Sequence, residues 1–436
     1  MAWKSILSLS RGHFTSHSIY TLRANAPAFR DIPPVWSQRR ICWERYAKPI
    51  YEFCREMVPM RQNIHQNIPI STTFVLGAGF SKCADLPLQA EFSSLLLSEE
   101  FNTDIDKVIT QAMKEFLRDV FDWHEGRELP SFEDIFTCID LSAGTGHHLG
   151  IKYTPKVLRA IRRMAIYRIF SVLDRKFSTS EDINKLLRSF CTSVNPASRC
   201  SFVVLNWDIV LEKHLRQLDP AVTIDYCCPC YDWNNPDTPM RPVGIPVCKM
   251  HGSSNWVYCD NCKSLFFDLN EKLSFHTKAG LIKSDFRLFD EKFTDRQFDA
   301  ALEISPEKRE CKFCRNMVSS HIATFSYRKS FRTPAYPSIW YHAEKLLSDS
   351  DRWVFIGYSL PEADYELKHL LKVAQLRMSH RKSTRKKKIV VVGKGDVSTR
   401  HKFERFYGSE TIKFYDGGLP EYVSKMCEGG NLPDSV

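Results

Sequence analysis

Two Cys-x-x-Cys pairs constrain this chain of 436 residues more than any other feature of its sequence. The first pair is Cys259 and Cys262, and the second is Cys311 and Cys314. Zn²⁺ takes four soft ligands in a tetrahedron, and each tight turn of this kind supplies two of them. The two pairs therefore predict one closed Cys₄ zinc site, which folds a small ribbon beside the rest of the protein.

Four other cysteines leave the ligand assignment open. Cys227, Cys228 and Cys230 lie close together, and Cys248 follows them shortly before the first Cys-x-x-Cys pair. They are either alternative ligands or ordinary buried thiols, and the matched spacing of the two pairs favours the second reading. The chain has fifteen cysteines, an odd number, and we find no secretory segment. This usage favours reduced thiols in a cytosol-like compartment over a disulfide framework.

The net charge of +10 comes from two segments of the chain. Residues 1–70 contribute +6, from ten basic and four acidic residues, and the segment from Arg377 to Lys388 contributes +7. The remainder sums to −3, so composition makes no case for nucleic-acid binding by the main body. The run Arg385–Lys388 is a nucleic-acid patch, a localisation signal or a solvated loop, and the lack of nearby aromatic residues favours the loop.

Residues 1–70 differ from the rest of the chain in composition. The first thirty hold four Lys or Arg, many Ser and no acid, which is typical of a transit peptide. A poorly ordered extension, or a true start nearer Met57 or Met60, explains the composition equally well, and we assign this segment no chemistry. No run of about 18 apolar residues occurs, so we expect no transmembrane helix and no membrane partner.

After residue 70, short buried strands alternate with glycine-containing turns and helices. Thr72–Leu76, Cys200–Leu205 and Arg352–Ile356 have the apolar, β-branched composition of buried strands. Ile389–Val392 and Thr411–Phe414 end the series. This order predicts an α/β fold with a doubly wound parallel sheet of the Rossmann-like class.

Two additions to this sheet are expected within one domain over residues 71–430. Residues 104–192 have apolar positions that recur every three or four residues, and they predict a helical insert. Within the insert, Ser131 and Asp134 have the spacing of a helix start. Residues 225–330 are irregular and carry most of the cysteines in question, so we expect the zinc-ribbon module there.

Polar or glycine-rich turns follow three predicted strands, and parallel α/β sheets bind ligands where such strand ends meet. Gly77-Ala-Gly-Phe-Ser81 lets backbone N–H groups approach a phosphate at a helix N-terminus, although a structural tight turn is an equal alternative. Asn206-Trp-Asp208 and Gly357-Tyr-Ser359 follow the next two strands. His251, which precedes a glycine and the first cysteine pair, can act as a general base near neutral pH. Taken singly, Asn206 and His251 are equally consistent with a helix cap and a turn residue.

The order of these motifs resembles that of the sirtuin superfamily over roughly residues 71–416. The forms Asn206-Trp-Asp208, His251-Gly-Ser-Ser-Asn-Trp256 and Gly357-Tyr-Ser-Leu-Pro361 are more similar to the sirtuin-like NADase branch, which is found largely in prokaryotic antiviral defence systems, than to protein deacetylases. The resemblance implies catalysis by Asn206 and His251. It implies that NAD is bound by Gly77, Ala78, Gly79, Ser81, Asp208, Gly357 and Ser359.

In this resemblance each polar side chain has an expected role. Asn206 would position water or the ribose, Asp208 would hold the carboxamide of nicotinamide, and His251 would be the general base. Three departures from the deacetylase pattern favour the NADase branch. The segment 85–92 lacks the Arg of the loop after the glycine motif, Leu205 replaces a Gln, and residues 322–327 offer no clear counterpart of the strand that grips acyl-lysine.

The resemblance therefore implies a zinc-containing hydrolase that cleaves NAD to nicotinamide and ADP-ribose. Two alternatives remain: an NAD-dependent protein deacylase that uses the same Asn206 and His251, and a non-catalytic module that binds NAD or ADP-ribose. We also expect a cytoplasmic location, and activation by a protein partner or by homo-oligomerisation.

Overall fold

The computed structural model describes residues 71–428 except residues 99, 101, 178–179, 195–198, 238–243, 270–279, 303–309, 323–334, 380–387 and 409–411. The expectations for residues 1–70, and for most of residues 385–388 and 322–327, lie outside the described residues. The expected domain over residues 71–430 stays a prediction. None of the described helices is long and apolar enough to cross a membrane.

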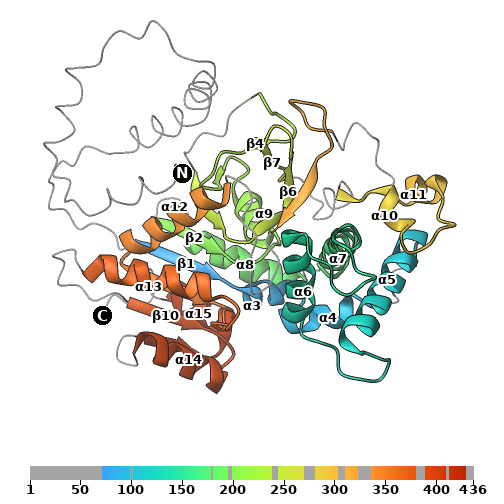
Figure 1. Cartoon of the computed structure of the whole chain (residues 1–436). Helices are drawn as coiled ribbons and strands as arrows, with labels where there is room; N and C mark the ends of the chain where they lie inside the picture. Colours follow the sequence, from blue (N-terminus) through green and yellow to red (C-terminus); the bar gives the residue numbers. More distant parts are fainter. Residues whose placement is uncertain are drawn as a thin grey trace, which may run out of the picture. The chain divides into compact units, whose positions relative to one another are not determined.

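Seven parallel strands form the central sheet, in the order β11-β10-β9-β1-β2-β5-β3 (Figure 1). All residues of the three central strands are buried, as a parallel sheet covered on both faces requires. The strand order reverses between β1 and β9. These two strands are paired in the sheet, although β2 and β5 lie between them in the sequence. The strands are β1 (Thr72–Leu76), β2 (Cys200–Val204), β3 (Ile224–Asp225), β5 (Ile245–Lys249), β9 (Arg352–Ile356), β10 (Lys388–Val392) and β11 (Ile412–Tyr415).

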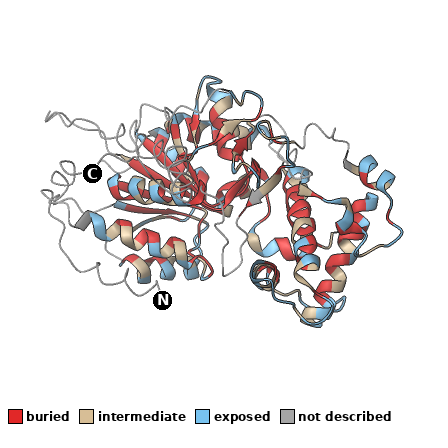
Figure 2. Cartoon of the chain, turned by 45° about the horizontal axis from the view of Figure 1, so that its top comes forward, coloured by how far each residue is buried: buried red, intermediate tan, exposed pale blue. Residues whose placement is uncertain are grey.

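Two groups of helices pack around this sheet, and the doubly wound Rossmann-like class is confirmed. α8 (Glu181–Ser193) packs against α9 (Val210–Leu218) and α15 (Gly418–Glu428). α12 (Ala335–Asp349) packs against α13 (Tyr365–Ser379). Figure 2 shows that the strands are buried and that the helices around them have one buried side and one exposed side. The helix between β10 and β11 is α14 (Val397–Tyr407).

The helical insert lies beside the sheet and consists of α5 (Asp104–Phe121), α6 (Phe132–Thr145) and α7 (Pro155–Lys176) (Figure 1). α7 packs against both α5 and α6. The fully buried Arg168 of α7 donates hydrogen bonds to the carbonyls of Ser98 and Asp106, at 3.0 and 2.8 Å. The buried guanidinium therefore ties the insert to the segment that follows β1.

The helical insert is shorter than the predicted range. Residues 104–192 are predicted to form one insert, but α8 packs with the sheet, where Phe190 lies edge-on against Phe74 of β1 at 5.5 Å. Between β1 and the insert, a 3₁₀ turn, Gln89–Glu91, is followed by the single turn α4, Phe92–Leu95. The carbonyl of Ser98, after α4, accepts a hydrogen bond from Arg168.

The cysteine-bearing region is more regular than its sequence predicted. It forms a second sheet in the order β4-β7-β6-β8, in which β6 pairs antiparallel with both β7 and β8. These strands come from segments that are far apart in the sequence, so no local sequence pattern predicts their pairing. The bounds are β4 (Tyr231–Asp232), β6 (Gly252–Tyr258), β7 (Leu265–Phe267) and β8 (Ser319–Ile322), with the short helices α10 (Lys283–Phe286) and α11 (Asp295–Leu302) nearby in the chain.

The turns after β1 and β9 touch through their backbones. The N–H of Gly77 donates to the carbonyl of Ile356 at 3.0 Å, and the N–H of Gly79 donates to the carbonyl of Gly357 at 2.9 Å. A Cβ atom on Gly357 would lie 2.3 Å from the backbone carbon of Gly79 and from the nitrogen of Phe80. Gly357 also has a φ of +62°, in the left-handed region that favours glycine.

We expect Gly357→Ala to lower the free energy of unfolding by at least about 1–3 kcal/mol, because it adds a backbone clash to an unfavourable φ. Denaturant unfolding followed by circular dichroism measures this change. Gly393→Ala is the matched control, since its Cβ would meet no atom within 4 Å at another strand end. Equal stabilities of the two variants would contradict the close packing described here.

Candidate functional site

A cavity of about 1140 Å³ lies where the carboxyl ends of the parallel strands meet. It extends over the position between β1 and β9 at which the strand order reverses, the usual ligand site of open α/β sheets. Residues directly after six strands contribute to its wall, together with the start of α6 from the insert. Those that follow strands include Gly77, Asn206, His251, Gly357, Gly393 and Asp416.

The glycine turn after β1 forms one wall of the cavity. Gly77, Ala78 and Gly79 line it, whereas Ser81 is buried behind them. The helix that follows, α3 (Ala78–Ser81), has one turn only. Because the N–H groups of Gly77 and Gly79 donate to the carbonyls of Ile356 and Gly357, a phosphate at this wall would gain little from these two donors or from a helix macrodipole.

Asn206 is held with a fixed orientation at the end of β2. Its side-chain Nδ2 donates to the carbonyl of Gly77 at 2.9 Å and to Oγ of Ser81 at 2.8 Å. Both amide hydrogens are thus used, so Asn206 can offer a ligand only its acceptor oxygen, Oδ1. The predicted residue Ser81 acts on the site through this contact and does not line the cavity itself.

His251 is buried at the end of β5, beside Asn206. Its Nδ1 lies 3.0 Å from the carbonyl oxygen of Leu205, the residue before Asn206. Because a carbonyl only accepts, Nδ1 carries the hydrogen, and Nε2 is the basic atom of the neutral ring. Nε2 lies 3.9 Å from Oδ1 of Asp364, a buried carboxylate that also lines the cavity. A proton taken up at Nε2 would be stabilised by this carboxylate.

Asp208, like Ser81, is not among the residues that line the cavity. Its carboxylate Oδ1 accepts the N–H of Val210, the first residue of α9, at 3.0 Å. It lies behind the wall, close enough to Cys83 to contribute to the raised pKa of that thiol, about 12, of which burial is the main cause. Its role toward a carboxamide stays a prediction.

Gly357 and Ser359 line the cavity after β9, as predicted residues. Four charged residues that were not predicted also line it, and they lie in the segments after β10 and β11: Lys394, Asp396, Arg400 and Asp416. A signal for them exists in the sequence: Gly393-Lys-Gly395 and Asp416-Gly-Gly418 follow predicted strands in the same way as the earlier motifs. From the insert, residues 128–133 also line the cavity, and no strand pattern could have placed them there.

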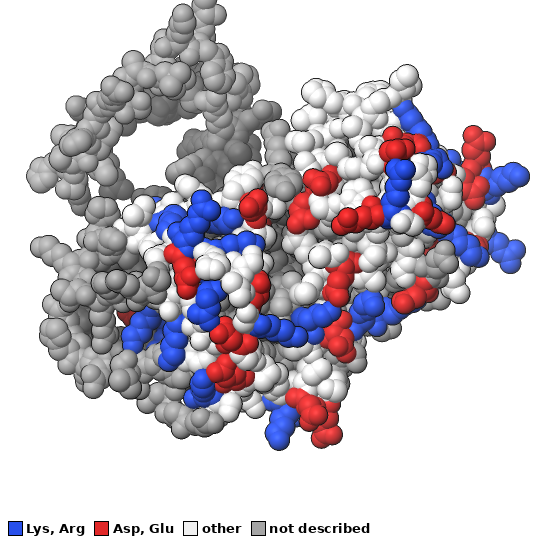
Figure 3. Space-filling model, turned by 90° about the horizontal axis from the view of Figure 1, so that it is seen from below, with Lys and Arg blue, Asp and Glu red and all other residues white. Residues whose placement is uncertain are grey.

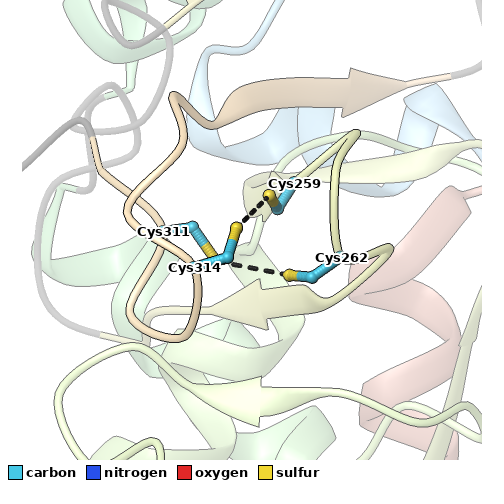
Figure 4. A group of neighbouring side chains, drawn as sticks. All are labelled: Cys259, Cys262, Cys311 and Cys314. Atoms are coloured by element: carbon cyan, nitrogen blue, oxygen red, sulfur yellow. Dashed lines mark hydrogen bonds between the residues drawn. The ribbon is translucent and has the colours of Figure 1, made fainter.

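The four cysteines of the two pairs come together in the second sheet (Figure 4). Their sulfur atoms all lie within 4.8 Å of one another, with Cys259–Cys314 at 3.4 Å and Cys262–Cys311 at 3.5 Å. A tetrahedron of Zn–S bonds of about 2.3 Å separates its sulfurs by about 3.8 Å. The donor set and its spacing therefore fit Zn²⁺, and these residues could hold it.

Local contacts favour a thiolate at one of the four cysteines. Hydrogen bonds from Asn261 and Asn316 lower the pKa of Cys314 to about 5, while burial raises that of Cys311 to about 12. A thiolate, the form that binds metal, is thus available at Cys314 near neutral pH. None of the four cysteines lines the cavity, so the cluster fits a structural site better than a catalytic one.

The other four cysteines do not join this cluster. Among the described residues, the Cys₄ cluster is the one group of at least three such side chains that could hold a metal ion. A hydrogen bond to Cys230 raises the pKa of Cys228, and one to Cys227 raises that of Cys248. Cys228 and Cys248 are therefore protonated thiols at neutral pH.

We expect one zinc ion per chain, and we expect Cys259→Ser or Cys311→Ser to release it and lower the melting temperature, because metal binding is coupled to folding. Metal analysis and thermal unfolding of the purified proteins measure both effects. Cys427→Ser, which changes an exposed thiol, is the control. Loss of zinc from Cys227→Ser or Cys230→Ser, with the first two variants retaining it, would move the ligand assignment.

Both signs of charge occur on the surface of the described residues. Figure 3 shows basic and acidic side chains interspersed over one face of the protein. Several exposed pairs are close enough for ion pairing, such as Lys114 with Glu125 at 2.7 Å and Lys152 with Asp119 at 2.8 Å. A polyanion meets no field of a single sign on this face.

No protein-family model matches the chain, and no curated protein matches it. Among solved structures it is similar to a sirtuin studied for the structural basis of substrate affinity, at 13% identity and a TM-score of 0.38, over 84% of this chain and 96% of that one. Sir2Tm bound to a propionylated peptide gives 13% identity, a TM-score of 0.37 and coverages of 84% and 95%. Sir2 with a p53 peptide and NAD⁺ gives 14%, 0.36, 84% and 95%. These identities are too low to transfer an activity.

Proposed function

We propose that the protein cleaves the bond between nicotinamide and ribose in NAD and releases nicotinamide and ADP-ribose. The arrangement of Asn206 and His251 carries this proposal. The two side chains follow neighbouring strands, line one cavity, and are linked because His251 donates to the residue before Asn206. One supplies a basic nitrogen and the other an acceptor oxygen.

The chemistry of NAD suits these two groups. Nicotinamide leaves as a neutral molecule from a ring that is already cationic, so the site needs no strong acid. It must stabilise positive charge on the ribose and present water to C1′. Oδ1 of Asn206 can accept a hydrogen bond from that water or from a ribose hydroxyl. Nε2 of His251 can take the proton of the water, and Asp364 stabilises the imidazolium that forms.

The size and walls of the cavity suit a dinucleotide. Its volume of about 1140 Å³ exceeds that of a typical pocket for a drug-sized molecule, roughly 300–1,000 Å³. Gly77, Ala78 and Gly79 present no side chain larger than a methyl group on this wall, so a pyrophosphate has room to approach it. Zinc at the Cys₄ cluster would hold the second sheet together, and β6 of that sheet begins directly after His251.

We assign the protein to the sirtuin-like NADase branch, with a cytoplasmic location and a role in antiviral defence. The motif forms described above and the cysteine usage support this assignment. Activation by a protein partner or by homo-oligomerisation is part of the same proposal, because an unregulated NADase would deplete the NAD of its own cell.

Water, rather than acyl-lysine, is the proposed acceptor. A deacylase must order an extended peptide and hold its acyl chain against the ribose. In this chain the start of α6 lines the cavity, so the helical insert occupies part of its wall. We expect nicotinamide and ADP-ribose to form from NAD without any acylated peptide, as chromatography of the products would measure. Nicotinamide release that requires an acyl-lysine peptide, together with formation of acyl-ADP-ribose, would establish the deacylase alternative instead.

We expect His251→Ala and Asn206→Ala each to lower the turnover of NAD by about 10²-fold or more, as the loss of a catalytic group does. Nicotinamide release under saturating NAD measures the effect. Both side chains are buried, so the melting temperature of each variant must be compared with that of the wild type. Ser94→Ala, which changes an exposed residue of the same cavity, is the control. Full activity of a folded variant would remove that residue from the mechanism.

A further inference from the structure

We propose that Glu133, at the start of α6 in the helical insert, is a catalytic carboxylate that faces the reacting ribose and stabilises its positive charge. This inference rests on the proposed cleavage of NAD. It assigns to the insert a chemical role in addition to its role as a wall. Glu133 lines the same cavity as Asn206, His251 and Asp364.

The residues on both sides of Glu133 fix its position. Oγ of Ser131 accepts the N–H of Asp134 at 3.1 Å and donates to its carboxylate at 2.7 Å, which caps the helix. Phe132 is buried and packs against Phe92 at 5.4 Å. The capping and the apolar anchor are thus carried out by its neighbours, and Glu133 is not needed for either.

A second segment of the chain holds the carboxylate itself. Nε2 of Gln89, from the 3₁₀ turn after β1, donates to Oε1 of Glu133, and Gln89 also lines the cavity. The carboxylate is therefore positioned from the sheet side as well as from the insert. A catalytic group needs this kind of support from packing and from hydrogen bonds.

The charged groups that act on Glu133 are anions, so a bound cation would be stabilised near it. Burial raises its pKa, and the anions Asp134 and Asp364 raise it further, against the lowering effect of its own backbone N–H. An ionised, half-buried carboxylate near the buried Asp364 is electrostatically costly, and a cation between the two lowers this cost. The nicotinamide ring of NAD, and then the ribose as the bond breaks, is a cation of this kind.

The proposed step balances as follows. The bond between C1′ and the ring nitrogen breaks, and its electron pair leaves with nicotinamide, which becomes neutral. The positive charge moves to C1′ and the ring oxygen of the ribose, where the carboxylates of Glu133 and Asp364 stabilise it. The oxygen of water bonds to C1′, and its proton goes to Nε2 of His251.

Glu133→Gln tests this role because it removes the charge and keeps the shape and an oxygen that can accept from Gln89. We expect its kcat/KM for NAD to fall by about 10²-fold, while its Kd for ADP-ribose, which lacks the cationic ring, stays within about twofold. The melting temperature should stay the same or rise, since a carboxylate with a raised pKa destabilises the fold above that pKa. Glu128→Gln, at an exposed position of the same cavity, is the control and should keep its rate.

A pH profile adds a readout that a structural role would not change. Asp134 from α6 and Asp364 act on Glu133 by their charge, and Gln89 donates to it. The cavity also holds the titratable or charged residues Lys82, Glu128, His251, Lys394, Asp396, Arg400 and Asp416. The wild-type rate should fall as the pH drops through the raised pKa of Glu133, because protonation neutralises the carboxylate. Glu133→Gln should lose this acidic limb and keep any limb that belongs to His251.

The outcomes separate this inference from the proposed function. Nicotinamide release by the wild type with equal rates for Glu133→Gln and Glu128→Gln would overturn the role of Glu133 and leave the hydrolase intact. If the wild type releases no nicotinamide, the hydrolase assignment is wrong. The affinity for NAD then tests whether the carboxylate of Glu133 faces the cationic ring. In that case, weaker binding of NAD but not of ADP-ribose by Glu133→Gln supports a carboxylate that faces the cation. Equal binding by both variants overturns it.

Discussion

The direct backbone contact between the turns after β1 and β9 is the constraint on which the site depends. Gly79 donates to the carbonyl of Gly357, and any Cβ atom on Gly357 would overlap the facing turn. The two strands are far apart in the sequence, and this contact holds their ends side by side where the strand order reverses. The cavity opens over this point because the helices that follow the two strands diverge to opposite faces of a doubly wound sheet.

A buried network under the cavity joins the remaining strand ends. The Nζ of Lys249 donates to the carbonyl of Asp208 and lies 3.4 Å from the carboxylate of Glu212, with Lys249 and Glu212 both fully buried. The N–H of Ser254 donates to the carbonyl of Trp207 at 2.7 Å. The segments that carry Asn206 and His251 therefore form one unit with β6, and the Cys₄ cluster closes the far end of that strand. A metal ion distant from the cavity can in this way support its geometry.

Much of the fold and part of the site could be predicted because they depend on local sequence. Five strands of the central sheet are short apolar runs, and they agree with the predicted ones to within one residue at either end. The glycine turns and Asn206 follow such runs directly, so the parallel topology places them together. The strands β3 and β5, the second of which positions His251, were not predicted. The second sheet and the position of α8 were missed, because antiparallel pairing between distant segments and the packing of Phe190 on β1 leave no local pattern.

The sequence by itself determined five strands of the central sheet, the turns that follow them and the identity of the four clustered cysteines, since each depends on spacing along the chain. Only the tertiary structure decided the order of the strands in the sheet and which polar side chains share the cavity. It directed the carboxylate of Asp208 to the N–H of Val210 behind the wall, and it brought Glu133 of the insert and Asp364 into the lining with His251. Contacts between residues more than a hundred positions apart fix these directions, because burial and hydrogen bonding orient a side chain after the backbone is in place.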